Sequence, residues 1–271
     1  MVGFMTERLP DLSRQYRRDL FEKFVLTGQG HPGSALSMVD IAVTLYHGGY
    51  VRRDDETGAI ADRVIVSKGH AAVVQYPILV ALGVLPQEAW DQWGHGPTPL
   101  RVFGNRSIPG IDVTSGSLGH GVGIGAGMAI AFERAALGTR VFVILSEGEL
   151  YEGSTWEAIL LATHHRLRNL TLIVDCNDLI ILGSPDSCVA LDPIADKLRG
   201  MGLVTQECDG HSHAALSQAL TVATSGHTGP HAIVARTVKG KGLSMMEHQA
   251  RWHYWNPMTA DEIARCRQEL A

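Results

Sequence analysis

The stretch Ser146-Glu147-Gly148-Glu149-Leu150-Tyr151-Glu152-Gly153 decides the fold, because of the segments on either side of it. The apolar run Arg140 to Leu145 precedes it and is typical of a buried strand in a parallel sheet. Residues 154–168 follow it and are predicted to form a helix. A second apolar run, Leu170 to Cys176, predicts another buried strand. The region is therefore expected to be one strand–helix–strand unit of a parallel sheet.

Two polar side chains stand where these predicted strands end. Glu147 follows the first strand and Asn177 follows the second. Since parallel strands joined by a crossover helix end at the same edge of the sheet, we expect the carboxylate and the amide to lie close together. Oxygen ligands of this kind suit a hard divalent cation and the phosphates that it neutralises.

The rest of the chain continues the alternation of helices and strands. Helices are predicted at residues 11–27, 38–47, 70–82, 118–137, 192–201, 213–223 and 259–270, and strands at 63–67, 203–208 and 230–236. Thr259 and Glu262 predict a capping box at the start of the last helix. Residues 94–117 are expected to form an ordered binding loop. The pattern favours the α/β class: a mostly parallel sheet with helices on both faces, in a single domain over residues 1–271.

Composition excludes several classes of function. The net charge is −5, so no basic surface indicates nucleic acid. No apolar run reaches the length of a membrane span, and residues 1–10 lack the charge and apolar order of a secretory signal. The four cysteines have no metal-site or disulfide spacing and are expected to be reduced thiols. We therefore expect a cytoplasmic protein without nucleic-acid or membrane partners.

Five motifs in the same order resemble those of one family. They are Gly30-His-Pro-Gly-Ser34, Ser67-Lys-Gly-His-Ala71, Thr114 to Gly121, Glu147 to Ala158, and Lys239-Gly-Lys-Gly242 with Trp252-His253. Together they are similar to the N-terminal, diphosphate-binding half of transketolases, from about residue 11 to 258. One such motif is weak evidence, whereas five in register are specific.

The resemblance implies a cofactor and a set of site residues. The cofactor would be thiamine diphosphate with Mg²⁺ (or Ca²⁺). The implied metal ligands are Glu147, Asn177 and the backbone carbonyl of Leu179. The implied cofactor-binding residues are His70, Gly116, Ser117, Leu118, Gly148, Glu149 and Asn177, and the implied catalytic residues are His31, His70, His253 and Glu152. Backbone N–H groups at a helix start suit a diphosphate, and histidines suit proton transfer near neutral pH.

The resemblance also implies a partner and a reaction. The chain ends after the diphosphate-binding domain, whereas the family has a second domain that binds the aminopyrimidine of the cofactor. We expect this pyrimidine domain on a partner subunit. Together with self-association, such a partner would give a hetero-oligomer. The expected activity is transfer of a two-carbon ketol or acyl unit from a small-molecule donor to an aldehyde acceptor.

The chain departs from the family pattern at four positions. Glu147 stands where the family has aspartate and is preceded by Ser146 instead of glycine. Phe103 stands where the family has a loop histidine (unless His95 substitutes), and Tyr254 where it has glycine. Two alternatives therefore stay open: a subunit of a 2-oxo acid decarboxylating carbon–carbon ligase, and a non-catalytic regulatory or scaffold protein. The histidines His211, His213, His227 and His231 are interpreted as surface or core residues.

Overall fold

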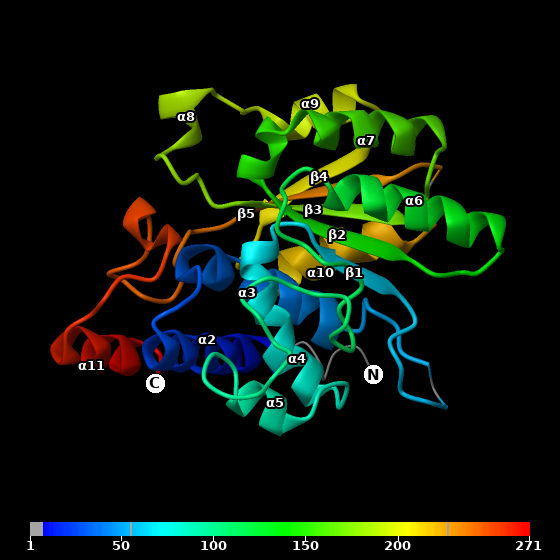
Figure 1. Ribbon diagram of the computed structural model, residues 1–271. Coiled ribbons are helices and arrows are strands. Elements are labelled where there is room, and N and C mark those ends of the chain that lie inside the picture. Colours follow the sequence, from blue (N-terminus) through cyan, green and yellow to red (C-terminus); the bar gives the residue numbers. More distant parts are fainter. Residues whose placement is uncertain (1–7, 55, 227) are drawn as a thin grey trace.

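The computed structural model describes residues 8–54, 56–226 and 228–271, so His227 lies outside the described part. Five strands form one sheet: β1 (Arg63–Val66), β2 (Val141–Ser146), β3 (Leu170–Cys176), β4 (Val204–Asp209) and β5 (His231–Arg236). Their order is β1-β2-β3-β5-β4, and every neighbouring pair is parallel (Figure 1). The predicted parallel sheet is confirmed.

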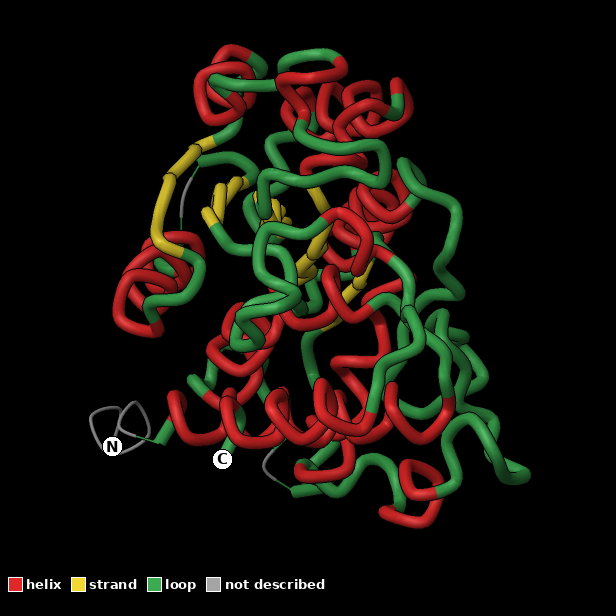
Figure 2. The backbone as a smooth tube through the Cα atoms, turned by 90° about the vertical axis from the view of Figure 1, so that its left-hand side faces the viewer, coloured by secondary structure: helices red, strands yellow, loops and turns green. Residues whose placement is uncertain are grey.

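Helices cover both faces of the sheet, as predicted (Figure 1). On one face lie α6 (Gly121–Arg134), α7 (Gly153–His164) and α9 (Ile194–Gly200), which pack on side chains such as Val143 and Leu172. On the other lie α2 (Leu9–Thr27), α3 (Pro32–His47), α4 (Gln75–Ala81) and α10 (His213–Thr224), against Phe142 and Ile173. Turned by 90°, the strands again lie between helices (Figure 2). Alternate residues of one strand thus enter opposite cores.

The shorter elements lie in the connections and at the C-terminal end. They are α5 (Gln87–Asp91), α8 (Pro185–Cys188), α11 (Ala260–Glu269) and the 3₁₀ turns η1 (Gly69–Val74), η2 (Glu147–Tyr151) and η3 (Ala250–His253). The capping box of Thr259 and Glu262 is present at the start of α11. Within the described residues all four cysteines are free thiols, and none of the described helices is both long and apolar enough to cross a membrane.

Several predicted helix bounds are wrong for local reasons. α3 begins at Pro32 instead of residue 38, because proline suits the first position of a helix. The predicted helix 70–82 starts as the 3₁₀ turn η1. α6 begins three residues later than predicted, since Gly119 has a φ of +84° and ends the preceding turn. α7 ends at His164, and Arg166 with a φ of +53° turns the chain toward β3.

The sheet register brings Glu147 and Asn177, two of the predicted metal ligands, to one edge of the sheet. Ser146 pairs with Asp175, so Glu147 and Asn177 leave neighbouring strands side by side. Cys176 pairs with Arg236 at the end of β5, which directs Thr237 to Lys239 to the same edge. This edge carries the candidate active site.

Candidate active site

A cavity of about 360 Å³ opens at the carboxyl ends of β2, β3 and β5. It is lined by His31, Ser34, His70, Phe103, Gly116, Leu118, Ser146, Gly148, Tyr151, Asn177, Leu179, Ile180, Ile181, Lys239, His253 and Tyr254. Eight of the predicted site residues are therefore brought together from segments far apart in the sequence. The other four, Ser117, Glu147, Glu149 and Glu152, are not among its lining residues.

Three predicted histidines form one cluster inside this cavity. The ring centroids of His31, His70 and His253 lie 5.1 to 5.4 Å from one another. Burial, aided by the charge of Lys239, lowers the pKa of both His31 and His253 to about 4. Burial and the neighbouring lysines hold the pKa of His70 well below its usual range. At neutral pH the cluster therefore consists of uncharged imidazoles, which accept and donate protons.

Two aromatic side chains flank the histidine cluster. The ring of Tyr254 lies 5.0 Å from that of His31, and the ring of Phe103 lies 5.8 Å from it. Tyr254 is 53% exposed and Phe103 is 40% exposed, so both stand at the mouth of the cavity. Phe103 and Tyr254, which both depart from the family pattern, thus narrow the same entrance to the cavity.

Asn177, one of the predicted metal ligands, has a side-chain oxygen without a hydrogen-bond partner among the described residues. Asn177 Nδ2 donates to Ser37 Oγ at 3.4 Å, whereas the buried Asn177 Oδ1 has no hydrogen-bond partner among the described residues. A buried amide oxygen without a donor is costly unless something else satisfies it. An amide oxygen of this kind, with a buried acid on the neighbouring strand end, fits a hard divalent cation.

Glu147 follows β2 and contacts the turn after β3. Its Oε1 accepts a hydrogen bond from the backbone N–H of Leu179 at 3.1 Å, and it lines a neighbouring acidic cavity that also contains Asp178, Asp186 and Asp192. Burial, together with the charges of Asp175 and Asp178, raises the pKa of Glu147 to about 8. Ionisation of this carboxyl is thus unfavourable in the folded protein, and a bound cation would favour it.

The described acidic side chains at this edge do not form a complete metal site by themselves. No group of three or more His, Cys, Asp or Glu side chains in the described part of the chain is arranged to hold a metal. The Leu179 carbonyl accepts from Lys239 Nζ at 3.1 Å. Such a site suits Mg²⁺, which is commonly bound by one or two carboxylates and completed by phosphates and water.

Glu149 organises the predicted diphosphate loop instead of lining the cavity. It is fully buried, accepts from Gly119 N at 2.9 Å, and accepts from the hydroxyl of Ser67. Gly119 is required here, because a Cβ atom would lie 2.6 Å from the Cβ of Glu152. The hydrogen bonds of Glu149 therefore fix the loop outside the cavity, while Gly116 and Leu118 line the cavity.

Ser117 and Glu152 lie outside the main cavity. Ser117 is exposed and lines a separate pocket with Thr114 and Ile124. Glu152 is exposed where η2 meets α7. Its implied catalytic role stays a prediction.

Sequence reasoning missed two buried lysines that support the site. Lys68 Nζ is ion-paired with Asp175 Oδ2, and both side chains are fully buried. Lys239 is 1% exposed, and its Nζ lies 3.2 Å from His253 Nδ1. Burial and the charge of Lys68 lower the pKa of Lys239 to about 8. Both lysines lie inside motifs already quoted, so their position in those motifs was the available signal.

Comparison with known proteins identifies one family. The family described as "Transketolase, thiamine diphosphate binding domain" matches residues 13–271. A protein from Actinobacillus succinogenes, named as one of the subunits of an apulose-4-phosphate transketolase, is 33% identical over 89% of this chain and 87% of its own length. A 6-deoxy-6-sulfo-D-fructose transketolase subunit from a Clostridium species is 32% identical over 92% of each chain.

Solved structures agree as well. The transketolase of Campylobacter jejuni superposes with a TM-score of 0.84 at 25% identity, and that of Leishmania mexicana with 0.85 at 25%. The chain spans 42% and 41% of their lengths while 98% and 97% of it is covered. The motifs, the fold and the matched family agree, and this chain belongs to the transketolase family through its thiamine diphosphate-binding domain.

Proposed function

We propose that this chain is the diphosphate-binding subunit of a thiamine-diphosphate-dependent, transketolase-like enzyme that transfers a two-carbon ketol unit to an aldehyde acceptor. One observation carries the proposal: the buried, unpartnered Oδ1 of Asn177 lies in the same cavity as three uncharged histidines. An oxygen that needs a cation and imidazoles that move protons suit a diphosphate cofactor and carbon–carbon bond chemistry.

Different residues of this chain would bind the metal, bind the diphosphate and transfer protons. Asn177, Glu147 and the Leu179 carbonyl would hold Mg²⁺ or Ca²⁺, and the backbone of residues 116–121 at the start of α6 would bind the diphosphate. When bound, thiamine diphosphate supplies an electron sink for breaking and forming carbon–carbon bonds. His31, His70 and His253 would hold and move protons at their ring nitrogens, since all three are uncharged near neutral pH.

A partner subunit would cover an apolar rim around the cavity. Leu182 is 80% exposed and follows Ile181, which is 50% exposed and lines the cavity. Val189 is 66% exposed, and its carbonyl accepts a hydrogen bond from the hydroxyl of Tyr151, which also lines the cavity. Exposed apolar residues gathered at one place mark an interaction surface. A pyrimidine-domain subunit seated there would close the cavity, consistent with relatives of similar length that are named as subunits.

A second surface would serve self-association. Leu160 and Leu161 of α7 are 57% and 43% exposed, and Ile124 of α6 is 38% exposed. Glu152 lies at the start of the same helix as the two leucines. A second copy on this surface would produce a hetero-oligomer and place Glu152 between two sites. The four free thiols suit the reducing cytoplasm, where we place the protein.

A second candidate is a 2-oxo acid decarboxylating ligase with the same cofactor. Phe103 favours it, because its ring occupies the entrance beside His31 at 5.8 Å and leaves less room for a polyhydroxylated donor. Two-donor assays of the complex separate the candidates. Turnover of a keto-sugar phosphate without turnover of pyruvate supports ketol transfer, and the reverse supports the ligase.

Cofactor binding tests the proposal before any substrate is known. The chain is co-purified with its pyrimidine-domain partner and titrated calorimetrically with thiamine diphosphate, with and without Mg²⁺. Binding that requires Mg²⁺ and is lost in Asn177→Ala is the expected result. The matched control is Asn105→Ala, which changes a loop asparagine outside the cavity lining. Absence of any Mg²⁺-dependent binding by the wild-type complex contradicts the proposal and favours a non-catalytic role.

A further inference from the structure

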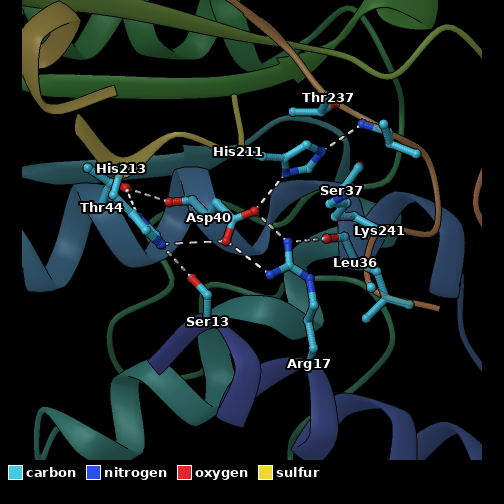
Figure 3. Close-up of polar contacts among 12 residues, drawn as sticks. Ser13, Arg17, Leu36, Ser37, Asp40, Thr44, His211, His213, Thr237 and Lys241 are labelled. Atoms are coloured by element: carbon cyan, nitrogen blue, oxygen red, sulfur yellow. Dashed lines mark hydrogen bonds and ion pairs between the residues drawn. The ribbon is translucent and has the colours of Figure 1, made fainter. Parts of the chain in front are cut away.

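A largely buried polar cluster lies where α2, α3 and the start of α10 meet (Figure 3), and it lines a cavity separate from the candidate active site. Arg17 donates to both oxygens of Asp40, at 3.0 and 2.5 Å. His211 Nδ1 lies 2.6 Å from Asp40 Oδ2. Burial opposes ionisation of Asp40, but the bonds to His211 and Arg17 outweigh it and hold the pKa of Asp40 well below its usual range. Asp40 is thus a fixed acceptor.

The bonds of His211 fix its tautomer. The backbone N–H of Val238 donates to His211 Nε2 at 2.8 Å. An imidazole nitrogen that accepts carries no proton, so the single proton of the neutral ring lies on Nδ1 and is donated to Asp40. Figure 3 shows His211 between Asp40 and the chain beside Thr237. The ring therefore joins a rigid carboxylate to the backbone of residue 238.

Residue 238 lies in the middle of a segment that reaches the cofactor cavity. Thr237 donates its hydroxyl to Asp175, which is the residue two before Asn177. Lys239 donates to the Leu179 carbonyl at 3.1 Å and contacts His253. The amide between these two contacts is the one that His211 accepts from.

We propose that His211 is a positioning residue that holds the Thr237–Lys239 segment, and through it Lys239, against the cofactor cavity. Asp40, kept in place by Arg17, sets the tautomer that His211 needs for this bond. The effect on cofactor binding rests on the proposed function above, whereas the effect on the segment itself does not. This role would go beyond the surface or core position expected of His211 from the sequence.

His213 provides a matched comparison within the same cluster. Its Nε2 lies 3.7 Å from Asp40 Oδ1, and its ring contacts Thr44 at 2.8 Å and Ser13 at 3.2 Å. These contacts join α10 to α2 and α3 and do not reach the Thr237–Lys239 segment. A change at His213 therefore disturbs the cluster without removing the acceptor for Val238.

Three variants separate positioning from general stability. H211N keeps a donor near Asp40 but has no acceptor at the distance of Nε2. H211Q places an amide oxygen near the former Nε2 and restores that acceptor. H213N is the control for damage to the cluster. Thermal unfolding of each variant with its partner reports the general loss of stability.

Two measurements need no cofactor. Hydrogen exchange with mass spectrometry follows the peptide containing Val238, and an amine-reactive reagent followed by peptide mapping reports exposure of Lys239, with the fully buried Lys68 as internal reference. H211N is expected to speed exchange and labelling about tenfold, while H211Q and H213N stay within about twofold of wild type. Calorimetry with Mg²⁺ and thiamine diphosphate should show about tenfold weaker binding for H211N alone.

Each outcome has one meaning. If H211N matches H213N in exchange and labelling, His211 does not hold the segment and the inference is overturned. If exchange and labelling change as expected but cofactor affinity stays at the wild-type value, the coupling of Lys239 to the cofactor is overturned. If the wild-type complex binds no cofactor, the proposed function fails, and the exchange and labelling results still decide the role of His211.

Discussion

Replacing Glu147 by glutamine should stabilise the protein more strongly as the pH rises. The Glu147 side chain is 2% exposed. Burial comes first among the causes that raise its pKa from 4.5 to about 8, and Asp175 and Asp178 add to it. Ionising this carboxyl in the folded protein is therefore costly, whereas a glutamine of nearly the same shape carries no such cost.

The size of the effect follows from the two pKa values. A carboxyl whose pKa is raised by folding holds its proton more tightly in the folded state, so its contribution is full below about pH 4.5 and falls away as the pH rises toward 8. The loss of unfolding free energy amounts to about 1 kcal/mol at pH 5 and about 4 kcal/mol at pH 8. Relative to wild type, E147Q should thus gain about 3 kcal/mol between these two pH values.

Urea denaturation of the two proteins across this pH range provides the assay. Glu88→Gln is the control, because Glu88 is an exposed acid in α5 and the same chemical change there should leave the pH dependence of wild type unaltered. Wild-type and E147Q stability curves that run parallel from pH 5 to pH 8 would refute the reasoning. They would mean that Glu147 ionises in the folded protein without penalty.

Three further predictions concern the support, the rim and the entrance of the cavity. Lys68→Met should lower the free energy of unfolding by about 3 to 5 kcal/mol in urea denaturation, because it leaves Asp175 buried without its cation, and adding Asp175→Asn should recover part of that loss. Leu182→Asp should weaken partner binding in analytical ultracentrifugation without changing thermal stability, whereas Leu137→Asp, at a 53% exposed position in the connection between α6 and β2, should change neither. Phe103→His should raise kcat/KM for a keto-sugar donor relative to pyruvate in the complex; an unchanged ratio counts against Phe103 as a selectivity residue.

The sheet and its site edge were predictable from local pattern. The apolar runs at 141–145 and 170–176 permit little except buried strands, and a crossover helix between them requires that they run parallel. The placement of Glu147 and Asn177 after neighbouring strand ends follows from that topology alone. The first residues of the helices were less predictable. Pro32 and Gly119 determine where α3 and α6 begin through the backbone angle of a single residue, and the spacing of apolar residues carries no information about that angle.

The side-chain directions at the site were not predictable in this way. Nothing local in the sequence indicates that Glu147 would accept a hydrogen bond from the Leu179 amide. The pairing of Asp40 with His211 joins residues 171 positions apart. Contacts of this kind depend on how whole layers pack, so a motif identifies the residues near a site while the structure assigns their partners.

The direction of the Asn177 amide follows from a chain of obligatory hydrogen-bond roles. Burial opposes ionisation of Asp175, but its ion pair with Lys68 outweighs this and lowers its pKa, so the carboxylate only accepts. Ser37 Oγ donates to it at 2.6 Å, which leaves that hydroxyl only an acceptor role toward Asn177. The Asn177 NH₂ group must therefore face Ser37, and Oδ1 must point away from it without a partner. A buried ion pair is weak evidence for stability, but here its charge determines which atom of Asn177 is left without a hydrogen-bond partner.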